Sequence, residues 1–73
     1  MTTKRYSVVI EPTSTGYSAW SPDVLGCVST GATEEETRAT FQDALTGHFE
    51  VIRELGCPIP EPHAFVDYVE VAP

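Results

Sequence analysis

The stretch that decides the fold is residues 33–60, which read TEEETRATFQDALTGHFEVIRELGCPIP. Thr33 is a good N-cap for a helix, and Glu36, three residues later, completes a capping box. Gly56 suits the position just after a helix, and two prolines close behind it prevent the helix from continuing. We therefore predict one long helix from about Glu34 to Leu55.

Two opposite faces are expected on this helix, because successive residues advance by about 100°. The predicted core face comprises Thr37, Phe41, Ala44, Leu45, His48, Ile52 and Leu55, with Phe49 and Val51 at its margins. The acidic ridge, as we call the opposite side, comprises Glu36, Asp43, Glu50 and Glu54. We expect the ridge to bind a partner, although a solvated helix face is the commoner explanation of such a pattern.

Outward from the helix, the sequence alternates between runs of β-forming residues and turn residues. We predict strands at Lys4–Glu11, Tyr17–Ser21 and Cys27–Thr30 before the helix. A proline-rich connector, residues 57–63, then leads to a predicted last strand at Ala64–Val71. The expected fold is α+β, a two-layer β-β-β-α-β arrangement with a three-stranded antiparallel meander. A right-handed crossover would place the last strand parallel to the first.

One helix can cover only one face of such a sheet. If Tyr17, Ala19 and Ser21 face the helix, then Trp20 and Ser18 lie on the uncovered face. An exposed tryptophan there indicates self-association, so we expect a homo-oligomer, a dimer or larger, with Trp20 and Ser18 in its interface. The alternative is that Trp20 caps one end of the core.

Length and charge restrict the function classes. Seventy-three residues allow one domain, 1–73. The net charge of −7 falls entirely on residues 31–73, because the acids and bases of residues 1–30 cancel. An acidic surface repels phosphate, so direct nucleic-acid binding is not expected, and a basic protein partner is favoured. Acidity that serves only solubility is the alternative. No apolar run is long enough for a membrane helix or a signal peptide, and we expect a cytoplasmic protein.

Catalysis, metal binding and cofactors are not expected. The possible ligands Cys27, Cys57, His48 and His63 lack any metal-site spacing, and a disulfide between the cysteines is not expected in the cytoplasm. The sequence has no nucleophile elbow and no phosphate-binding glycine loop. A metal-dependent nuclease would need a carboxylate in the middle of the first strand, which offers only apolar residues. A nuclease remnant using Asp67 or Glu70 is kept as a third hypothesis.

Two separated motifs resemble the HicB-like antitoxin family, and the match covers nearly the whole chain. Residues 22–36, PDVLGCVSTGATEEE, resemble the family signature P-D-L-P-G-C-x-x-x-G-x-T-x-E-E. Residues 56–62, GCPIPEP, resemble its G-x-P-I-P-x-P connector. The residues that carry the resemblance are Pro22, Asp23, Gly26, Cys27, Gly31, Thr33, Glu36, Pro58 and Pro60. This chain departs from the pattern in Leu25, which replaces a proline, in Thr37, which replaces an alanine, and in Ser21, which replaces an apolar residue.

The resemblance implies a truncated RNase H-like fold without a metal site. It also implies an antitoxin that binds and neutralises a small, basic, mRNA-cleaving toxin of the HicA type. Many family members carry a C-terminal DNA-binding domain, and up to Pro73 this chain has none, so a stand-alone toxin-binding domain is expected. An orphan oligomeric binding module, non-catalytic and with another protein or a small molecule as partner, is the alternative.

Overall fold

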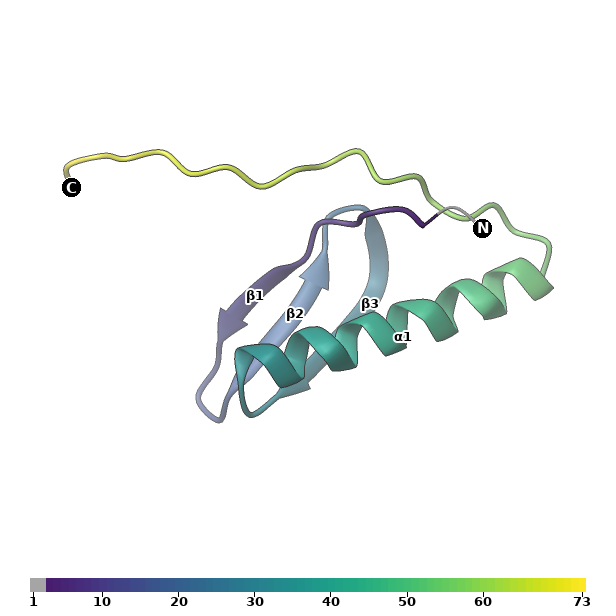
Figure 1. Cartoon of the computed structure of the whole chain (residues 1–73), viewed down its shortest axis with the longest axis horizontal. Coiled ribbons are helices and arrows are strands. Elements are labelled where there is room, and N and C mark those ends of the chain that lie inside the picture. The colour runs from purple at the N-terminus through teal and green to yellow at the C-terminus, as the bar shows by residue number, and fades with distance from the viewer. Residues whose placement is uncertain (1–2) are drawn as a thin grey trace.

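The computed structural model describes residues 3–73, in which three strands precede one helix (Figure 1). The strands are β1 (Val9–Pro12), β2 (Tyr17–Ser21) and β3 (Val24–Gly31), and the helix is α1 (Glu34–Glu54). β2 lies between β1 and β3 and pairs antiparallel with both. The predicted α+β fold, with a three-stranded meander and one helix, is confirmed in these elements.

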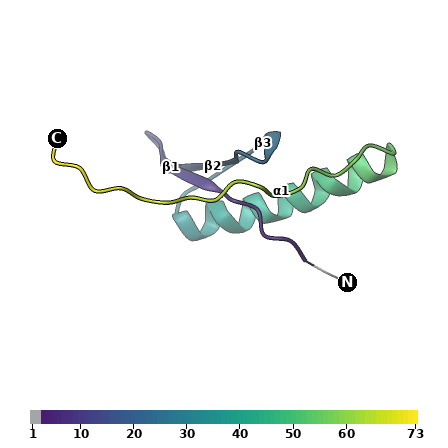
Figure 2. The same cartoon turned by 90° about the horizontal axis from the view of Figure 1, so that it is seen from above.

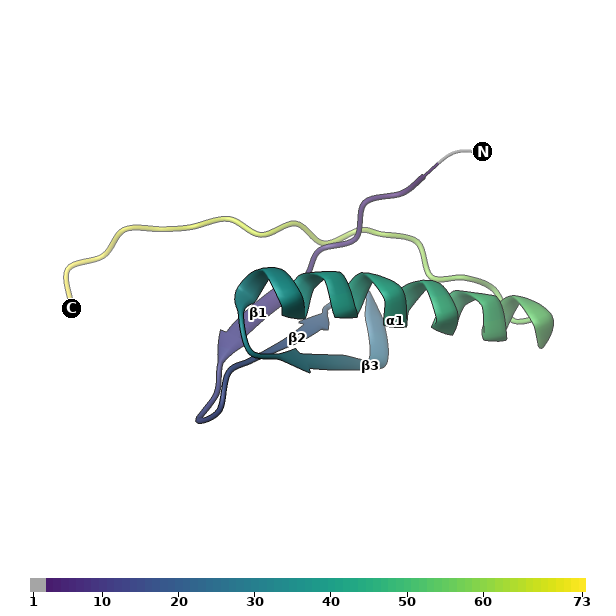
Figure 3. The same cartoon turned by 60° about the horizontal axis from the view of Figure 1, so that its bottom comes forward.

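Helix α1 lies along one face of the sheet, so the molecule has two layers (Figures 2 and 3). Between the layers, Phe41 and Leu45 of the helix pack on Ala19, Val24 and Cys27 of the sheet. All five side chains are buried, and they form the hydrophobic core. Because the core has one helix on one side only, no layer formed by residues 3–73 covers the outer face of the sheet.

The ends of α1 follow the local sequence signals. The Thr33 hydroxyl accepts a hydrogen bond from the Glu36 N–H at 3.1 Å, as an N-cap should. Gly56 follows the helix with φ +74°, in the left-handed region that favours glycine at this position. The predicted core face is correct at its centre and wrong at its end, where Leu55 is 72% exposed. The last turns of α1 extend past the sheet (Figure 1), and Leu55, which directly follows the helix, is left exposed.

The strand boundaries differ from the prediction at the β2–β3 turn. Ser21 already pairs with Val24, so only Pro22 and Asp23 separate the two strands. The pairing register shifts between Trp20 and Ser21, as in a β-bulge. The predicted strands imply a longer turn over residues 22–26, and this is wrong. Gly26 lies inside β3 with a φ of +81°, a backbone conformation that glycine adopts readily.

The predicted last strand at Ala64–Val71 is not formed within the described residues. Residues 57–73 have no regular secondary structure, and the chain from 65 onward runs away from the two layers (Figure 1). The reason lies where the strand should begin. The N–H groups of His63 and Ala64 donate to the carboxylate of Asp23 instead of to a backbone carbonyl of β1.

A membrane-spanning helix is not found in the described part of the chain, since α1 does not combine the required length with sufficient apolar character.

Candidate functional site

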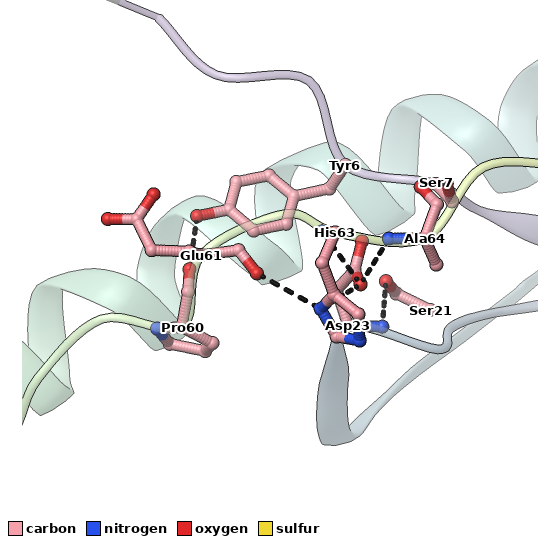
Figure 4. Close-up of polar contacts among 8 residues, drawn as sticks. All are labelled: Tyr6, Ser7, Ser21, Asp23, Pro60, Glu61, His63 and Ala64. Atoms are coloured by element: carbon pink, nitrogen blue, oxygen red, sulfur yellow. Dashed lines mark hydrogen bonds and ion pairs between the residues drawn. The ribbon is translucent and has the colours of Figure 1, made fainter.

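The β2–β3 turn holds a buried carboxylate, and this was not predicted. Oδ1 of Asp23 accepts hydrogen bonds from the backbone N–H groups of His63, at 3.2 Å, and Ala64, at 3.0 Å (Figure 4). The Asp23 side chain is fully buried, and its own N–H donates to the hydroxyl of Ser21 at 3.1 Å. Asp23 therefore joins the turn to a segment 40 residues away in the sequence.

The ring of His63 completes this contact. Its Nδ1 lies 2.9 Å from Oδ1 of Asp23 and 3.4 Å from the carbonyl oxygen of Glu61 (Figure 4). Both neighbours can only accept a hydrogen bond, so Nδ1 carries the proton. Burial pushes the pKa of Asp23 upward. The N–H groups of His63, Ala64 and Ser7, together with the His63 ring, nevertheless hold that pKa below its usual value.

The proline-rich connector lies against the N-terminal segment. The Tyr6 hydroxyl donates to the carbonyl of Pro60 at 2.6 Å, and the Ser7 hydroxyl donates to the carbonyl of Ala64 at 2.5 Å. Lys4 forms an ion pair with Glu61, and its hydrogen bond to that carboxylate raises the pKa of Lys4. Together with the Asp23 contacts, these bonds hold residues 60–64, the end of the connector and the residue after it, against the N-terminal segment and the β2–β3 turn.

The remaining motif residues build the fold. Cys27 is buried in the core and Cys57 is exposed, and both are free thiols. At Gly31, an added Cβ would lie 2.6 Å from the hydroxyl oxygen of Thr37, so glycine allows β3 to approach α1 closely. Thr33 caps the helix, as described above. The motif thus contributes turns, close approaches and caps, and the candidate partner surfaces lie largely outside it.

The outer face of the sheet is one such surface. Val9 pairs with Trp20 and Trp20 pairs with Val28, which places the three side chains in one row across the sheet. Trp20 is 40% exposed, Val28 is 65% exposed, and Trp20 donates from Nε1 to Glu11 at 2.6 Å. Ser18 follows in the next row. Since Trp20 points away from the buried core, it does not cap the core's end.

The acidic ridge is a second surface. All four residues of the ridge, Glu36, Asp43, Glu50 and Glu54, are exposed. Within residues 3–73 their carboxylates form no ion pair with this chain's own bases. Their negative charge is therefore available to a partner, and it is spread along the side of α1 that faces away from the sheet.

A groove next to the ridge was not predicted either. It has a volume of about 680 Å³ and its apolar lining is Tyr6, Leu45, Phe49 and Ile59. Its charged lining residues are Glu50, Lys4 and Arg53. The rings of Tyr6 and Phe49 stand 5.1 Å apart at 53°, which fixes the N-terminal segment on the helix. The one signal for this groove in the sequence was Phe49, at the margin of the core face. Its contact with Tyr6 depends on tertiary packing.

Metal ligands are not gathered anywhere in the described residues, where no three His, Cys, Asp or Glu side chains are placed to hold an ion. His48 is half-buried beside Phe49, with ring centroids 6.1 Å apart. Asp67 and Glu70, the candidates of the nuclease hypothesis, are exposed on the segment that leaves the two layers.

Comparison with known proteins agrees with the motifs. Residues 6–72 match the model of the HicB_like antitoxin of bacterial toxin-antitoxin systems. The chain is 37% identical over 67 residues to Antitoxin HicB 2 of Photorhabdus laumondii subsp. laumondii, covering 86% of this chain and 48% of that protein. It spans about half the length of this curated relative.

The fold matches a chain of a solved complex, described as the HicA3 and HicB3 toxin-antitoxin complex. The TM-score is 0.71 at 28% sequence identity, with 82% of this chain and 70% of that chain covered. The match to the family model, residues 6–72, includes the turn motif, the capped helix and the proline-rich connector. The Asp23 carboxylate joins the turn to the connector. The chain belongs to the HicB-like antitoxin family of bacterial toxin-antitoxin systems.

Proposed function

We propose that this domain is the toxin-binding part of an antitoxin and that it neutralises a small, basic, mRNA-cleaving toxin of the HicA type by direct contact. The observation that carries the proposal is the structural match to a chain of a toxin-antitoxin complex over 82% of this domain. The role needs no catalysis by this chain and no nucleic-acid contact, and it is exercised in the cytoplasm.

Charge supports the proposed partner. The acidic ridge carries four carboxylates that this chain's own bases leave unpaired within residues 3–73. A basic toxin would be steered toward such a surface and oriented on it. The groove beside Glu50 adds apolar contact area from Tyr6, Leu45 and Phe49, so charge and apolar surface lie side by side. Specific interfaces combine these features.

Co-expression tests the proposal directly. We expect this chain to restore growth to cells that express a small basic toxin encoded beside its gene, and to co-purify with that toxin. Growth arrest that persists in the presence of well-folded chain, together with the absence of a complex in size-exclusion chromatography, would show that the domain is not an antitoxin for that toxin.

The acidic ridge can be tested by a matched pair of double variants. Asp43→Lys with Glu50→Lys should slow association with the toxin at least about tenfold at low salt, because steering depends on local charge. Asp67→Lys with Glu70→Lys changes the net charge equally, but on the segment beyond the connector, and should have a much smaller effect. Equal effects of the two double variants would mean that overall charge, and not the ridge, governs binding.

A second proposal concerns self-association through the outer sheet face, with Trp20 and Ser18 at its centre. It is supported by the row of Val9, Trp20 and Val28, which no layer covers in the described chain. The same face would serve an orphan binding module with a different partner. A stable oligomer that binds no candidate toxin would favour that alternative.

A further inference from the structure

The segment from 65 to 72 exposes more large apolar side chains than any other part of the described chain. Phe65 is 84% exposed, Tyr68 and Val69 are each 87% exposed, and Val71 is 78% exposed. The segment runs out from the body of the domain in all three views (Figures 1, 2 and 3). The radius of gyration is 14.0 Å, whereas a compact chain of this length has about 11 Å. A large apolar surface is thus left without a place to pack.

The same segment has the properties of a β-strand. It consists mainly of aromatic and β-branched residues, and no proline interrupts residues 63–72, so every residue from 65 to 72 can donate an N–H. In the described residues these backbone groups form no hydrogen bond with another backbone group. Within the described residues, the segment is therefore able to form a strand but is paired with no sheet edge.

β1 offers a free edge. The sheet order is β1-β2-β3, so β1 pairs with β2 on one side and with no strand of the described chain on the other. Val9 and Ile10 are half-buried there, and Pro12 ends the strand. An unpaired edge of this kind accepts an extended segment that completes its hydrogen bonds.

Pairing with its own β1 edge is opposed by the contacts around Asp23. A strand that began to pair with β1 directly at the end of the connector would use the backbone groups of residues 63 and 64. Both N–H groups are bound by the Asp23 carboxylate, and the carbonyl of Ala64 accepts from the Ser7 hydroxyl (Figure 4). In the structure these backbone groups are bound by side chains, and residues 65–72 do not pair with β1 of the same chain.

We propose that residues 65–72 of one copy add as a strand to the β1 edge of a second copy, and that the exchange is reciprocal. Closed two-fold exchange of identical elements is a common way for a chain to form a dimer. Because side chains alternate along a strand, the two aromatic side chains of each segment would lie on opposite faces of the enlarged sheet, Phe65 with Val69 and Val71 on one and Tyr68 with Val66 on the other. The four rings of two copies would bury up to about 600–1,000 Å², and the valines and the two strand edges add to this area. The total is of the order of the roughly 1,200–2,000 Å² of a stable interface. The inference concerns the β1 edge, a different surface from the outer sheet face, and it does not depend on the toxin.

Complementary single-cysteine chains test the exchange. One chain carries Val69→Cys and the other Pro12→Cys, each with Cys57→Ser to remove the exposed native thiol. A short thiol-reactive crosslinker should join the two chains into a covalent heterodimer, because each chain alone offers only one of the two positions. The control replaces Pro12→Cys with Thr40→Cys, exposed on α1, and should give at least about tenfold less product.

The result that would overturn the exchange is equally clear. The proposed exchange is wrong if the yield of crosslinked heterodimer does not exceed the yield of the Thr40→Cys control. It is also wrong if a chain that carries both cysteines crosslinks only within itself, as a monomer. The second pattern would show that the segment pairs with its own β1.

Mass measurement gives an independent readout. Phe65→Ser with Tyr68→Ser should raise the dissociation constant of the dimer at least about tenfold, while the far-ultraviolet circular dichroism of α1 stays unchanged, because both residues lie outside the core. The control, Asp67→Asn with Glu70→Gln, removes like charge and should leave the dimer as stable or more stable. If the serine variant keeps the wild-type mass while Trp20→Ala dissociates the oligomer, self-association through the outer sheet face holds and the exchange does not.

Discussion

At the scale of single residues, Asp23 has the most consequences in this structure. It closes the two-residue turn between β2 and β3 and holds the backbone of His63 and Ala64. Its part in the family signature could be recognised from the sequence, but its partners could not, because they follow it by 40 and 41 residues. One physical signal was present. The connector contains three prolines, which have no N–H, so its first pair of adjacent donors is at 63 and 64.

Asp23→Asn should lower the melting temperature by roughly 5–10 °C near pH 7, because a buried acceptor of several N–H groups loses its charge. The pKa of Asp23 is lowered in the folded chain, so the stabilisation is fully present above its unfolded value of 3.8 and is lost as the pH falls through the folded value. Thermal melts of both proteins between pH 7 and pH 3 should therefore converge at the acid end. A difference in melting temperature between the two proteins that stays constant from pH 7 to pH 3 would contradict the role of the ionised carboxylate.

Trp20 gives the second prediction at this scale. Trp20→Ala should weaken self-association more than it lowers the stability of the monomer, because the side chain is 40% exposed and outside the core cluster. Light scattering across a dilution series, with urea unfolding of the same protein, separates the two effects. Thr40→Ala, exposed on α1 and so away from the outer face of the sheet, is the control and should change neither. An unchanged mass for Trp20→Ala would refute the outer-face interface.

At the scale of elements, prediction from sequence succeeded where the determinants are local. The helix ends at Glu54, one residue before the predicted end, because its cap and its terminating glycine act within one turn. The strand after the connector was not formed, although its residues favour a strand, and the backbone donors at its start, 63 and 64, are bound to the distant Asp23 instead. The groove lined by Tyr6 and Phe49 was missed for a similar reason, since it depends on contacts between distant segments.

Two glycines make a matched test of how β3 and α1 pack. Gly31→Ala should destabilise the fold by about 1–3 kcal/mol, because the new Cβ would lie 2.6 Å from Oγ1 and 2.9 Å from the backbone nitrogen of Thr37. Gly47→Ala, in the middle of α1, meets nothing within 4 Å and should stabilise the fold by up to about 1 kcal/mol through helix propensity. Urea titrations measure both. Equal stabilities for Gly31→Ala and the wild type would mean that β3 and α1 separate easily.

At the scale of the whole molecule, charge and apolar surface point to two different kinds of contact. The net charge of −7 is carried by the second half of the chain, and the acidic ridge lies on the outer side of the helix. The apolar surface is on the opposite side of the sheet and on residues 65–72. A basic partner and a second copy would therefore use different parts of the domain. The two associations should then respond differently to added salt.

Two copies of a chain with charge −7 repel one another, and salt screens that repulsion, since the Debye length falls from about 14 Å at 0.05 M to about 4 Å at 0.5 M. Apolar burial does not weaken with added salt over this range. Sedimentation of the chain alone should therefore show a dimer that is unchanged or tighter at 0.5 M. Association with a basic toxin, measured by surface plasmon resonance, should slow at least about tenfold over the same interval, because steering is lost. If self-association also weakens with salt, ion pairs hold the copies together, and neither the row at Trp20 nor the exchanged segment can be the main contact.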